Sequence, residues 1–436
     1  MSSSTLLPLL SELDPSESAE GGTDPLGLYP ISDALAVQMV PGVRERQQRV
    51  RFLTIIAASL AVCEGLEEVI DGPVTTEPWL AFEWHVVEGL VRTSDSQADT
   101  AGLPGSLKAR QAVADRVPLS AKRYLKTPSV FGFHGVYRLL ARTLGIEREG
   151  RLAETGHELL LVWEEDQGLE GFTSQSNNGP GGKLRRDWRR AVESAIERGS
   201  TVVKTDWSRF RQYLDIHNVG PREAAFLSKC LLDNYGHCGE VLRFLKSRPG
   251  RRVWSETQDE RAFHTELLAA NPSEGLAALL MGIVAYEAFA RSCTDAFDAV
   301  LVELTRRDTK TDLFSLAKLR EVKTARREVA KLYRTALDKL EPLGQALRFQ
   351  EAFASLAKPG TTADWVTALA EHHRQIQLRK LPDGKTPWFE RFDDGSLMIR
   401  PLYCKLPGKG TEGRYVHAYR IRSLSSFARD LHLLPA

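Results

Sequence analysis

The chain lacks the features that mark secreted and membrane proteins. It has five cysteines in 436 residues, and their odd number and scattered spacing argue against a disulfide framework. Residues 1–23 lack the cationic segment of a secretory signal peptide, and no apolar run reaches the roughly 18 to 20 residues that a membrane span needs. Even the best candidate, residues 275–290, is interrupted by Glu287. These absences predict a cytoplasmic protein that does not enter a membrane.

The chain also lacks the common motifs of nucleotide, metal and catalytic sites. Its GKT triplet begins at Gly384, but Arg379 stands where a phosphate-binding loop needs its first glycine, and Pro387 interrupts the helix that should follow. Cys230 and Cys238 fall on an apolar helical face rather than in the paired arms of a zinc site, which favours core thiols. No serine, cysteine or histidine set of a hydrolase is legible. We therefore predict no cofactor and no metal.

A strong overall charge is absent as well, although charge is uneven along the chain. The formal net charge is +1, so no global field draws the molecule to nucleic acid or to a membrane. Residues 1–40 carry six acidic side chains and no lysine or arginine, whereas residues 183–211 carry nine basic side chains against four acidic ones. Residues 372–430 carry twelve against six. Such local surfaces can contact phosphates while the total charge stays near zero.

The organisation of the chain follows from composition and periodicity. Residues 1–23, rich in serine, glutamate and glycine, predict a disordered tail, and the glycine- and asparagine-rich residues 169–183 predict a linker. We expect a helical domain over 24–168, a second helical domain over 184–360, and a basic α+β module over 361–436. The predicted fold class is mainly α and multi-domain.

Two further expectations concern element boundaries. Pro41 and Gly42 break the first helix, and a long helix is expected from about residue 44 to residue 69. In the C-terminal module, strand-like alternation with turn residues at Asp394-Gly395 and at 410–413 predicts β-hairpins. A last helix is expected over 425–434.

The C-terminal module offers one candidate surface for phosphates. On a strand, Tyr415, His417 and Tyr419 share one face, and arginines share the other. Exposed cations on edge strands also serve to prevent edge-to-edge pairing, so both roles remain open. The candidate contacts of this module are Lys405, Lys409, Arg414, Arg420 and Arg422.

A second candidate surface opens the helix that follows the predicted linker. The stretch KLRRDWRRAVESAIERG brings four arginines to one helical side, while Trp188 is expected to face the core. The alternative is a solvated face that pairs with Glu193 and Glu197; contact with phosphate or with an acidic protein is the functional interpretation. The four candidate contacts are Arg185, Arg186, Arg189 and Arg190.

The segment at about 120–165 has the order of elements of a known binding unit. Val136, Leu139, Leu140 and Leu144 form one apolar helical face, and Gly145 stops the helix before the charged turn EREGR. The sequence LAETG follows. This succession resembles winged helix–turn–helix domains. The resemblance implies contact with nucleic acid or with another protein.

Residues 24–54 resemble the opening block of a bacterial protein family that is encoded in anti-phage defence islands, beside helicases and methyltransferases. The matching residues are Asp24, Leu26, Gly27, Pro41, Gly42, Arg49 and Arg51, with Phe52 at the place of an aromatic. A second block runs from His372 or His373 through Gly384, Lys385, Pro387 and Trp388. The resemblance assigns no catalytic residue, so it implies an accessory subunit of a DNA-targeting defence system.

Three hypotheses follow from the sequence. The first is a non-catalytic subunit of an anti-phage defence complex that binds DNA, or a partner helicase, nuclease or ATPase. The second is a metal-dependent nuclease whose residues assemble only in three dimensions, and the polar residues to inspect are Glu83, His85, His134, Lys385 and Asp394. The third is a winged-helix transcriptional regulator.

Overall fold

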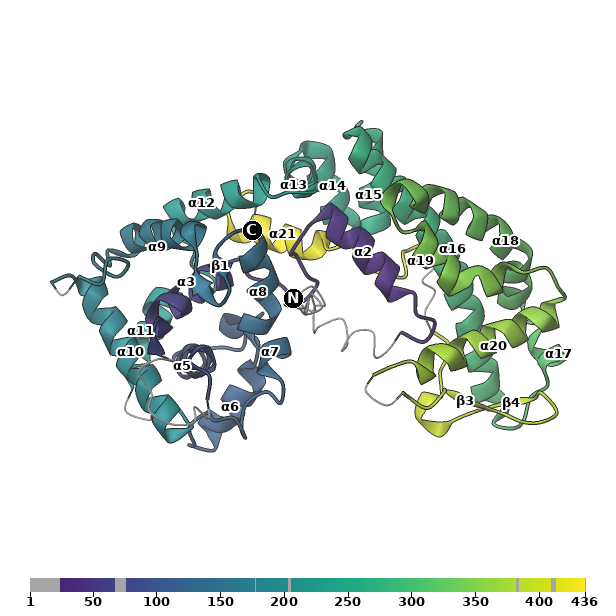
Figure 1. Ribbon diagram of the computed structural model, residues 1–436, viewed down its shortest axis with the longest axis horizontal. Helices are drawn as coiled ribbons and strands as arrows, with labels where there is room; N and C mark the ends of the chain where they lie inside the picture. The colour runs from purple at the N-terminus through teal and green to yellow at the C-terminus, as the bar shows by residue number, and fades with distance from the viewer. Residues whose placement is uncertain are drawn as a thin grey trace, which may run out of the picture. The chain divides into compact units, whose positions relative to one another are not determined.

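A computed structural model of the chain describes residues 24–66, 76–176, 178–202, 205–381, 384–408 and 413–435. These residues form two compact units, which are described separately (Figure 1). Unit 1 comprises Val40–Ser247 and residues 420–435, and unit 2 comprises residues 24–39 and Arg248–Tyr419. The described part of the chain is mainly helical with two short antiparallel hairpins, which confirms the predicted fold class.

Unit 1 is a set of helices around one apolar helix, α3. Because α3 is hydrophobic on every side, nearly all of its residues are buried, and α5, α8, α9 and α10 pack around it. Its strands, β1 (Glu147–Arg148) and β2 (Arg151–Leu152), form one hairpin. Its helices are α3 (Phe52–Cys63), α5 (Pro78–Arg92), α6 (Ser106–Ala114), α7 (Pro128–Phe131), α8 (Phe133–Thr143), α9 (Glu154–Gln167), α10 (Pro180–Arg198), α11 (Ser208–Leu214), α12 (Pro221–Leu232), α13 (Cys238–Lys246) and α21 (Ile421–Asp430), with a 3-10 turn, η3, at Ala98–Thr100.

The start of α3 differs from the sequence prediction. The sequence predicts a helix from about residue 44, but residues 44–51 run as turns and α3 begins at Phe52. The hydroxyl of Tyr137 accepts hydrogen bonds from the backbone N–H groups of Gln48 (2.7 Å) and Arg49 (2.8 Å). Since a side chain far along the chain satisfies these amides, no helical hydrogen bond is needed here.

The glycine-rich segment 169–183 is packed inside unit 1 and does not act as the predicted linker between domains. A Cβ atom on Gly181 would lie 1.8 Å from the carbonyl oxygen of Leu169, and one on Gly182 would lie 1.8 Å from that of Ser176. The glycines therefore permit a close approach of two backbones, which a flexible linker does not require. The unit boundary instead falls at residue 247, between α13 and α14.

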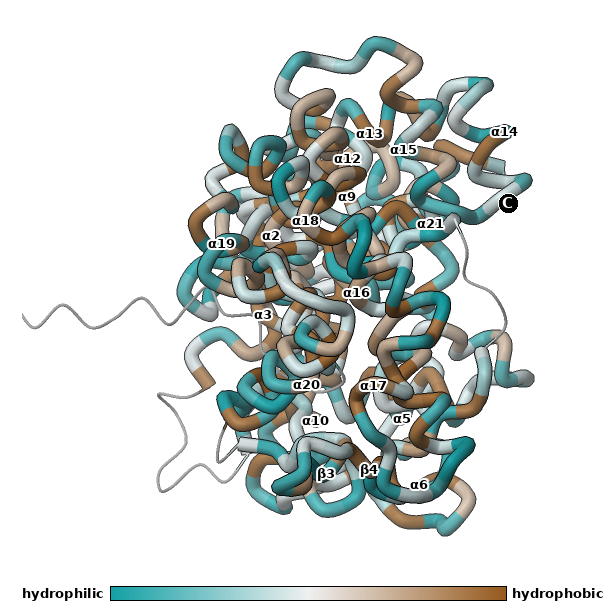
Figure 2. Tube along the Cα trace, turned by 90° about the vertical axis from the view of Figure 1, so that its right-hand side faces the viewer, coloured by the Kyte–Doolittle hydropathy of each residue, from teal (hydrophilic) through white to brown (hydrophobic). Residues whose placement is uncertain are grey.

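Unit 2 is organised around the long helix α16, which packs against α18, α2 and β4 (Figure 1). Apolar positions recur at helical spacing along α18 and are buried. Figure 2 colours the trace by hydropathy, and brown and teal stretches alternate along it. The strands are β3 (Phe389–Arg391) and β4 (Leu397–Ile399). The helices are α2 (Tyr29–Met39), α14 (Arg248–Thr257), α15 (Glu260–Ala269), α16 (Glu274–Arg307), α17 (Leu313–Leu316), α18 (Arg320–Leu340), α19 (Ala346–Phe353) and α20 (Thr362–Leu378), with 3-10 turns η4 (Glu341–Leu343), η5 (Ala354–Ala357) and η6 (Pro401–Tyr403).

By length and composition alone, α16 is apolar enough to cross a membrane, in contrast to the sequence expectation. In the structure, 56% of its most apolar 18-residue window is buried, and Glu287 in this helix binds four side-chain and backbone groups of unit 2. The helix therefore forms the core of unit 2.

The C-terminal segment is only partly as predicted. β3 pairs with β4 through the expected turn at Asp394-Gly395, with Phe389 opposite Ile399. The strand expected over 414–422 is absent from the described residues, because Ile421 begins helix α21, which belongs to unit 1. The second predicted turn falls at 410–413, of which residues 410–412 lie outside the described residues.

Candidate nucleic-acid interface

Within the segment at about 120–165 that resembles a winged helix, α8 is followed by a short hairpin and then by helix α9. α8 ends at Thr143, beside Gly145, and the strands of the hairpin pair with Glu147 opposite Leu152 and Arg148 opposite Arg151. Glu149 and Gly150 form its two-residue turn, with φ values of 54° and 79°. Positive φ at both positions is the geometry of a type I′ turn, which suits the twist of a short hairpin.

Arginines line the exposed side of α8 and this hairpin. Arg138 and Arg142 lie one turn apart on α8, and each bonds to Oε1 of Glu147, at 2.9 and 3.1 Å. Their side chains remain 47% and 38% exposed, whereas Glu147 is buried. Arg148 and Arg151 are exposed on the hairpin. A buried carboxylate thus orients two of four arginines, which we call the α8 surface.

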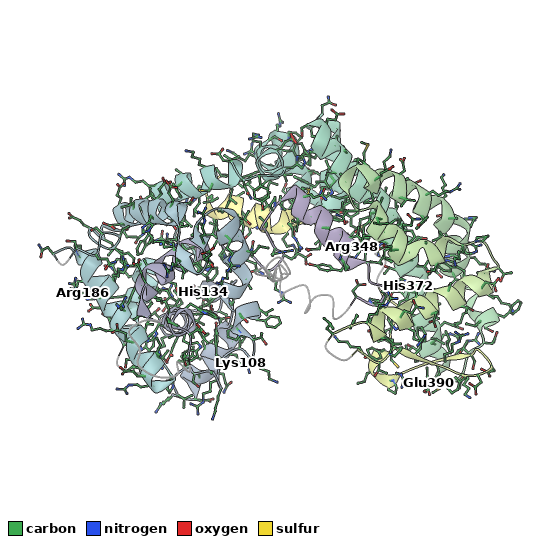
Figure 3. The ribbon with its side chains drawn as sticks, in the orientation of Figure 1. Lys108, His134, Arg186, Arg348, His372 and Glu390 are labelled. Atoms are coloured by element: carbon green, nitrogen blue, oxygen red, sulfur yellow. The ribbon has the colours of Figure 1, made fainter. Side chains whose placement is uncertain are left out.

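A buried polar network holds the inner side of α8. Glu83 of α5 accepts a hydrogen bond from the Tyr124 hydroxyl (2.7 Å) and from the backbone N–H of His134 (3.0 Å). The Nδ1 atom of His134 lies 3.0 Å from Glu83, and its Nε2 atom lies 3.0 Å from the hydroxyl of Ser59 on α3. Burial, together with Glu83, raises the pKa of Tyr124. The network joins α3, α5 and α8, and Figure 3 shows His134 among these helices.

The order Ser59–His134–Glu83 is that of a serine hydrolase triad, so its accessibility decides its role. Ser59 is 0% exposed and lies inside α3, where helical hydrogen bonds occupy the backbone N–H groups. A triad nucleophile needs an open path to substrate and free amide groups for the oxyanion. These residues therefore form a buried polar network that holds α8 against α3 and α5.

The basic residues at the start of α10 are mainly engaged with their own unit. Arg185 is buried, and its guanidinium donates to the carbonyl oxygens of Phe172 (3.1 Å), Thr173 and Ala61, where burial lowers its pKa. Arg189 pairs with Glu193 (3.1 Å), as the alternative interpretation of this face predicts, and Arg190 pairs with Asp187. Arg186 is exposed at the edge of unit 1 (Figure 3).

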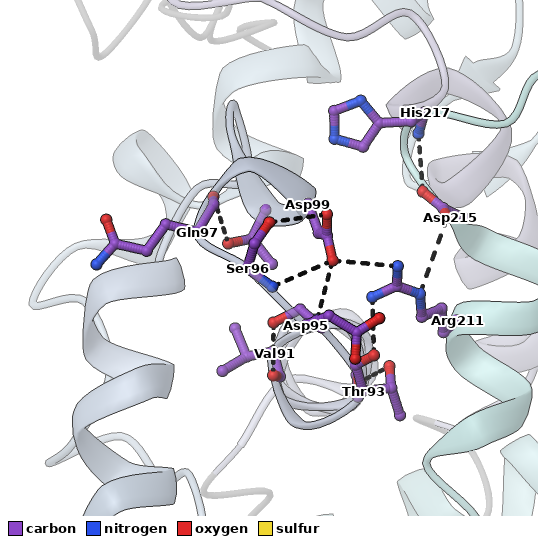
Figure 4. Close-up of polar contacts among 12 residues, drawn as sticks. Val91, Thr93, Asp95, Ser96, Gln97, Asp99, Arg211, Asp215 and His217 are labelled. Carbon is purple, nitrogen blue, oxygen red and sulfur yellow. Dashed lines mark hydrogen bonds and ion pairs between the residues drawn. The ribbon is translucent and has the colours of Figure 1, made fainter.

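Other cations of the basic stretch 183–211 also have structural partners. Arg211 of α11 donates to the carbonyl oxygen of Thr93 (2.8 Å) and lies 3.3 Å from Asp99 (Figure 4). Asp99 also accepts hydrogen bonds from the backbone N–H groups of Asp95 and Ser96, and these bonds lower its pKa. This network links α11 to the end of α5. Part of the local excess of positive charge is therefore paired within unit 1.

The candidate residues of the C-terminal module do not share one face. Arg420 is buried and pairs with Glu45 (2.9 Å) in unit 1, because it precedes a helix and does not lie on an exposed strand. Arg422 is exposed in the same unit. Lys405 pairs with Asp298 (2.5 Å) and Arg414 lies 3.9 Å from Asp259 in unit 2. Lys409 lies outside the described residues.

Two of the residues that carry the resemblance to the defence-island family, Asp24 and Arg51, have structural roles. Asp24 accepts hydrogen bonds from the backbone N–H groups of Leu26 and Tyr29 at the start of α2. Arg51 forms a buried ion pair with Glu223.

The two blocks that carry this resemblance also contact each other in unit 2. His372 (Figure 3) bonds to the carbonyl oxygen of Leu26 (2.8 Å). His373 bonds through Nδ1 to that of Pro25 (2.8 Å), and its Nε2 accepts the N–H of Trp388 (3.0 Å). This places the proton on Nδ1, and burial lowers the pKa of His373 to about 4.

Of the residues singled out for a nuclease, Glu83 and His134 bond to each other in unit 1, whereas His85 and Asp394 have other partners. His85 donates from Nδ1 to the carbonyl oxygen of Ala81 and stacks on Trp207, and Asp394 binds Ser396 in a turn of unit 2. Among the described residues, no group of three or more His, Cys, Asp or Glu side chains is placed to hold a metal ion. Burial raises the pKa of Cys238 to about 12, as expected of a core thiol.

Comparison of the chain with protein-family models, with curated proteins and with solved structures found no match. We did not predict the α8 surface from the sequence, although the spacing of two of its arginines indicates it. Arg138 and Arg142 are four residues apart and lie opposite the apolar face that the periodicity predicts.

Proposed function

We propose that this chain is a non-catalytic accessory subunit of a bacterial anti-phage defence complex that contacts DNA through the α8 surface. The observation that carries the DNA part is the pairing of Arg138 and Arg142 on the buried carboxylate of Glu147. The carboxylate fixes two guanidinium groups on the solvent side of a helix, next to a hairpin with two further arginines. The defence complex, with a helicase, nuclease or ATPase as partner, is supported by the resemblance of residues 24–54.

The chemistry of the α8 surface fits a DNA backbone. Guanidinium groups present several donors in a planar fork and pair well with phosphate oxygens. In winged-helix units a helix enters the major groove while the adjacent hairpin lies along the duplex, so both elements carry cations. The exposed Glu149 at the turn and the buried Glu147 leave a net charge of +2 on the set of six residues.

The test measures binding of the full chain to a duplex of about 30 base pairs at salt concentrations from about 50 to 200 mM. The variant R138Q/R142Q/R148Q/R151Q should bind more weakly at every sequence, and the slope of log K against log salt should flatten by about 0.9 for each phosphate that is no longer neutralised. The matched control is R306Q/R307Q/K339Q/R374Q. It removes four exposed cations of unit 2 that pair with neighbouring carboxylates.

An unchanged slope in a folded α8 variant, or an equal change in the control, would contradict the DNA part of the proposal. The partner part has its own test, a pull-down of the tagged chain from its native host. Recovery of no helicase, nuclease or ATPase would contradict it. A sequence-specific footprint upstream of the chain's own gene would favour the transcriptional regulator instead.

A further inference from the structure

Helix α18 of unit 2 exposes a continuous row of cations that lies apart from the basic stretches of the sequence. Five basic residues follow one another at spacings of three, four, four and three along the helix. At 100° per residue these positions fall within about 80° of the helix circumference, and the row is about 21 Å long. We call this row the α18 stripe; its members are Arg320, Lys323, Arg327, Lys331 and Arg334.

The stripe is solvent-exposed because the opposite side of α18 is anchored in the core. Val322, Val329 and Leu340 on that side are 0% exposed, and α18 packs against α16 along its length. The side chains of Arg320 and Arg327 are 82% and 74% exposed, and each forms an ion pair with the glutamate that follows it in sequence. Since exposed pairs of this kind are weak, the stripe keeps its positive field.

A groove of about 660 Å³ runs beside the stripe. Its arginines are Arg326, Arg327 and Arg334, and it is also lined by Ala357 at the end of η5 and by Pro359. Arg326 donates two hydrogen bonds, of 2.6 and 3.1 Å, to the carbonyl oxygen of Gly360, which fixes the guanidinium across the groove. The groove therefore has cations on its rim and small residues at its wall.

We propose that the α18 stripe and this groove bind the phosphate backbone of a single nucleic-acid strand, at a site separate from the α8 surface. One straight row of cations, one every three or four residues or roughly 4.5 to 6 Å, suits one backbone rather than the two of a duplex. Tyr333 lines the groove, but its ring stacks on Phe349 within unit 2, with 5.1 Å between the ring centroids. The ring is therefore not available to stack on a base. Recognition is thus of the backbone and independent of sequence.

Two other anionic partners fit the surface less well. A protein interface needs a central apolar anchor, whereas the exposed positions next to the cations are occupied by Thr324, Glu328 and Thr335. A membrane-surface helix needs a free apolar face, and that of α18 is buried against α16. A polyanionic strand requires neither feature.

The experiment measures binding of the full chain to a fluorescein-labelled oligothymidylate of about 30 nucleotides by anisotropy, from about 50 to 200 mM salt. Four phosphate contacts on a single strand contribute a slope of about 2.8, or roughly a 50-fold change in affinity over this range. The variant K323Q/R327Q/K331Q/R334Q should lack that part of the slope. The control R306Q/R307Q/K339Q/R374Q, which also removes four positive charges, should keep it.

Each outcome distinguishes this site from the α8 surface. The α18 variant should retain the duplex slope of the wild type, and the α8 variant should retain the oligothymidylate slope. The inference is overturned if a folded α18 variant binds oligothymidylate with the wild-type slope, if the control shows an equal decrease, or if the variant changes only binding to vesicles rich in phosphatidylserine. If the α18 variant lost the same amount of salt slope on oligothymidylate and on duplex DNA, the stripe would be assigned to duplex DNA and the single-strand assignment would be overturned. None of these results alters the test of the α8 surface.

Discussion

At the scale of single residues, burial decides which polar groups are structural. Arg185 and Arg420 have the same side chain as the exposed Arg138 and Arg151, yet both are buried and bound to groups of their own unit. A buried guanidinium deprived of its partners would be destabilising by several kcal/mol, so these partners are part of the fold. The same reasoning applies to the carboxylate of Glu83, which is completely buried.

Replacement of His134 tests how much the buried polar network that holds α8 contributes to stability. His134→Phe keeps a ring of similar size but leaves Glu83 with one hydrogen bond fewer and Ser59 without its ring partner. We expect the free energy of unfolding to fall by about 2 to 4 kcal/mol, because a buried carboxylate loses a partner. Urea denaturation of the full chain measures this change.

Ser59→Ala is the companion variant. It removes only the weaker hydroxyl interaction, so we expect a decrease of about 1 kcal/mol in the free energy of unfolding. A catalytic role predicts the opposite, since a nucleophile can be removed without loss of stability. If S59A kept wild-type stability and abolished an ester-hydrolysis activity of the purified chain, the structural assignment of this network would be wrong.

At the scale of elements, close backbone approaches decide where segments pack. Residues 169–183 have the composition of a linker, but their glycines lie against carbonyl oxygens of the same segment. Composition shows that the chain can bend there, and only the tertiary contacts show that the bend is fixed. The start of α3 has a similar cause, since Tyr137 and Asp430 bind the amides that precede it.

Gly181→Ala tests whether this segment is packed. Its new methyl group would meet the carbonyl oxygen and carbon of Leu169, which are backbone atoms and cannot rotate away. We expect a decrease of about 1 to 3 kcal/mol in the free energy of unfolding. Gly408→Ala is the control, because a Cβ atom at Gly408 meets nothing within 4 Å. Equal stability of the two variants would support the linker after all.

At the scale of the whole molecule, buried histidines make stability depend on pH. Burial lowers the pKa of His264 in unit 2 to about 3, and its ring nitrogens have no hydrogen-bond partner among the described residues. Its ring lies against those of Tyr415 and Tyr419. The unfolded chain therefore takes up this proton near pH 6.5, before the folded chain does. The stabilisation is present above pH 6.5 and disappears as the pH falls from 6.5 toward 3.

His264→Phe tests this dependence. A single group of this kind changes the free energy of unfolding by about 1.4 kcal/mol for each pH unit below about 6.5. As the pH is lowered to about 4.5, the free energy of unfolding of H264F should therefore rise relative to that of the wild type, by that amount for each pH unit. Urea titrations at several pH values measure it. Parallel stability curves would show that another group dominates.

The sequence by itself determined the features that depend on local periodicity. These are the mainly helical class, the helix after residue 183 that is now seen as α10, and the turn at Asp394-Gly395. It also identified α8 and the charged hairpin turn after Gly145. Local spacing is sufficient here, because capping, turn geometry and the apolar face are properties of neighbouring residues.

Only the tertiary structure decided which cations are free to bind a partner. Among their partners, Ala61 lies 124 residues from Arg185 and Glu45 lies 375 residues from Arg420, so no local pattern reveals these contacts. The same holds for the return of α21 to unit 1 and for the packing of residues 169–183. Conversely, α18 is an ordinary charged helix in the sequence, and only the packing of its apolar side against α16 shows that five cations are left on the surface. Burial depends on the packing of the whole unit. It therefore decides which of the many arginines and lysines in the sequence remain exposed.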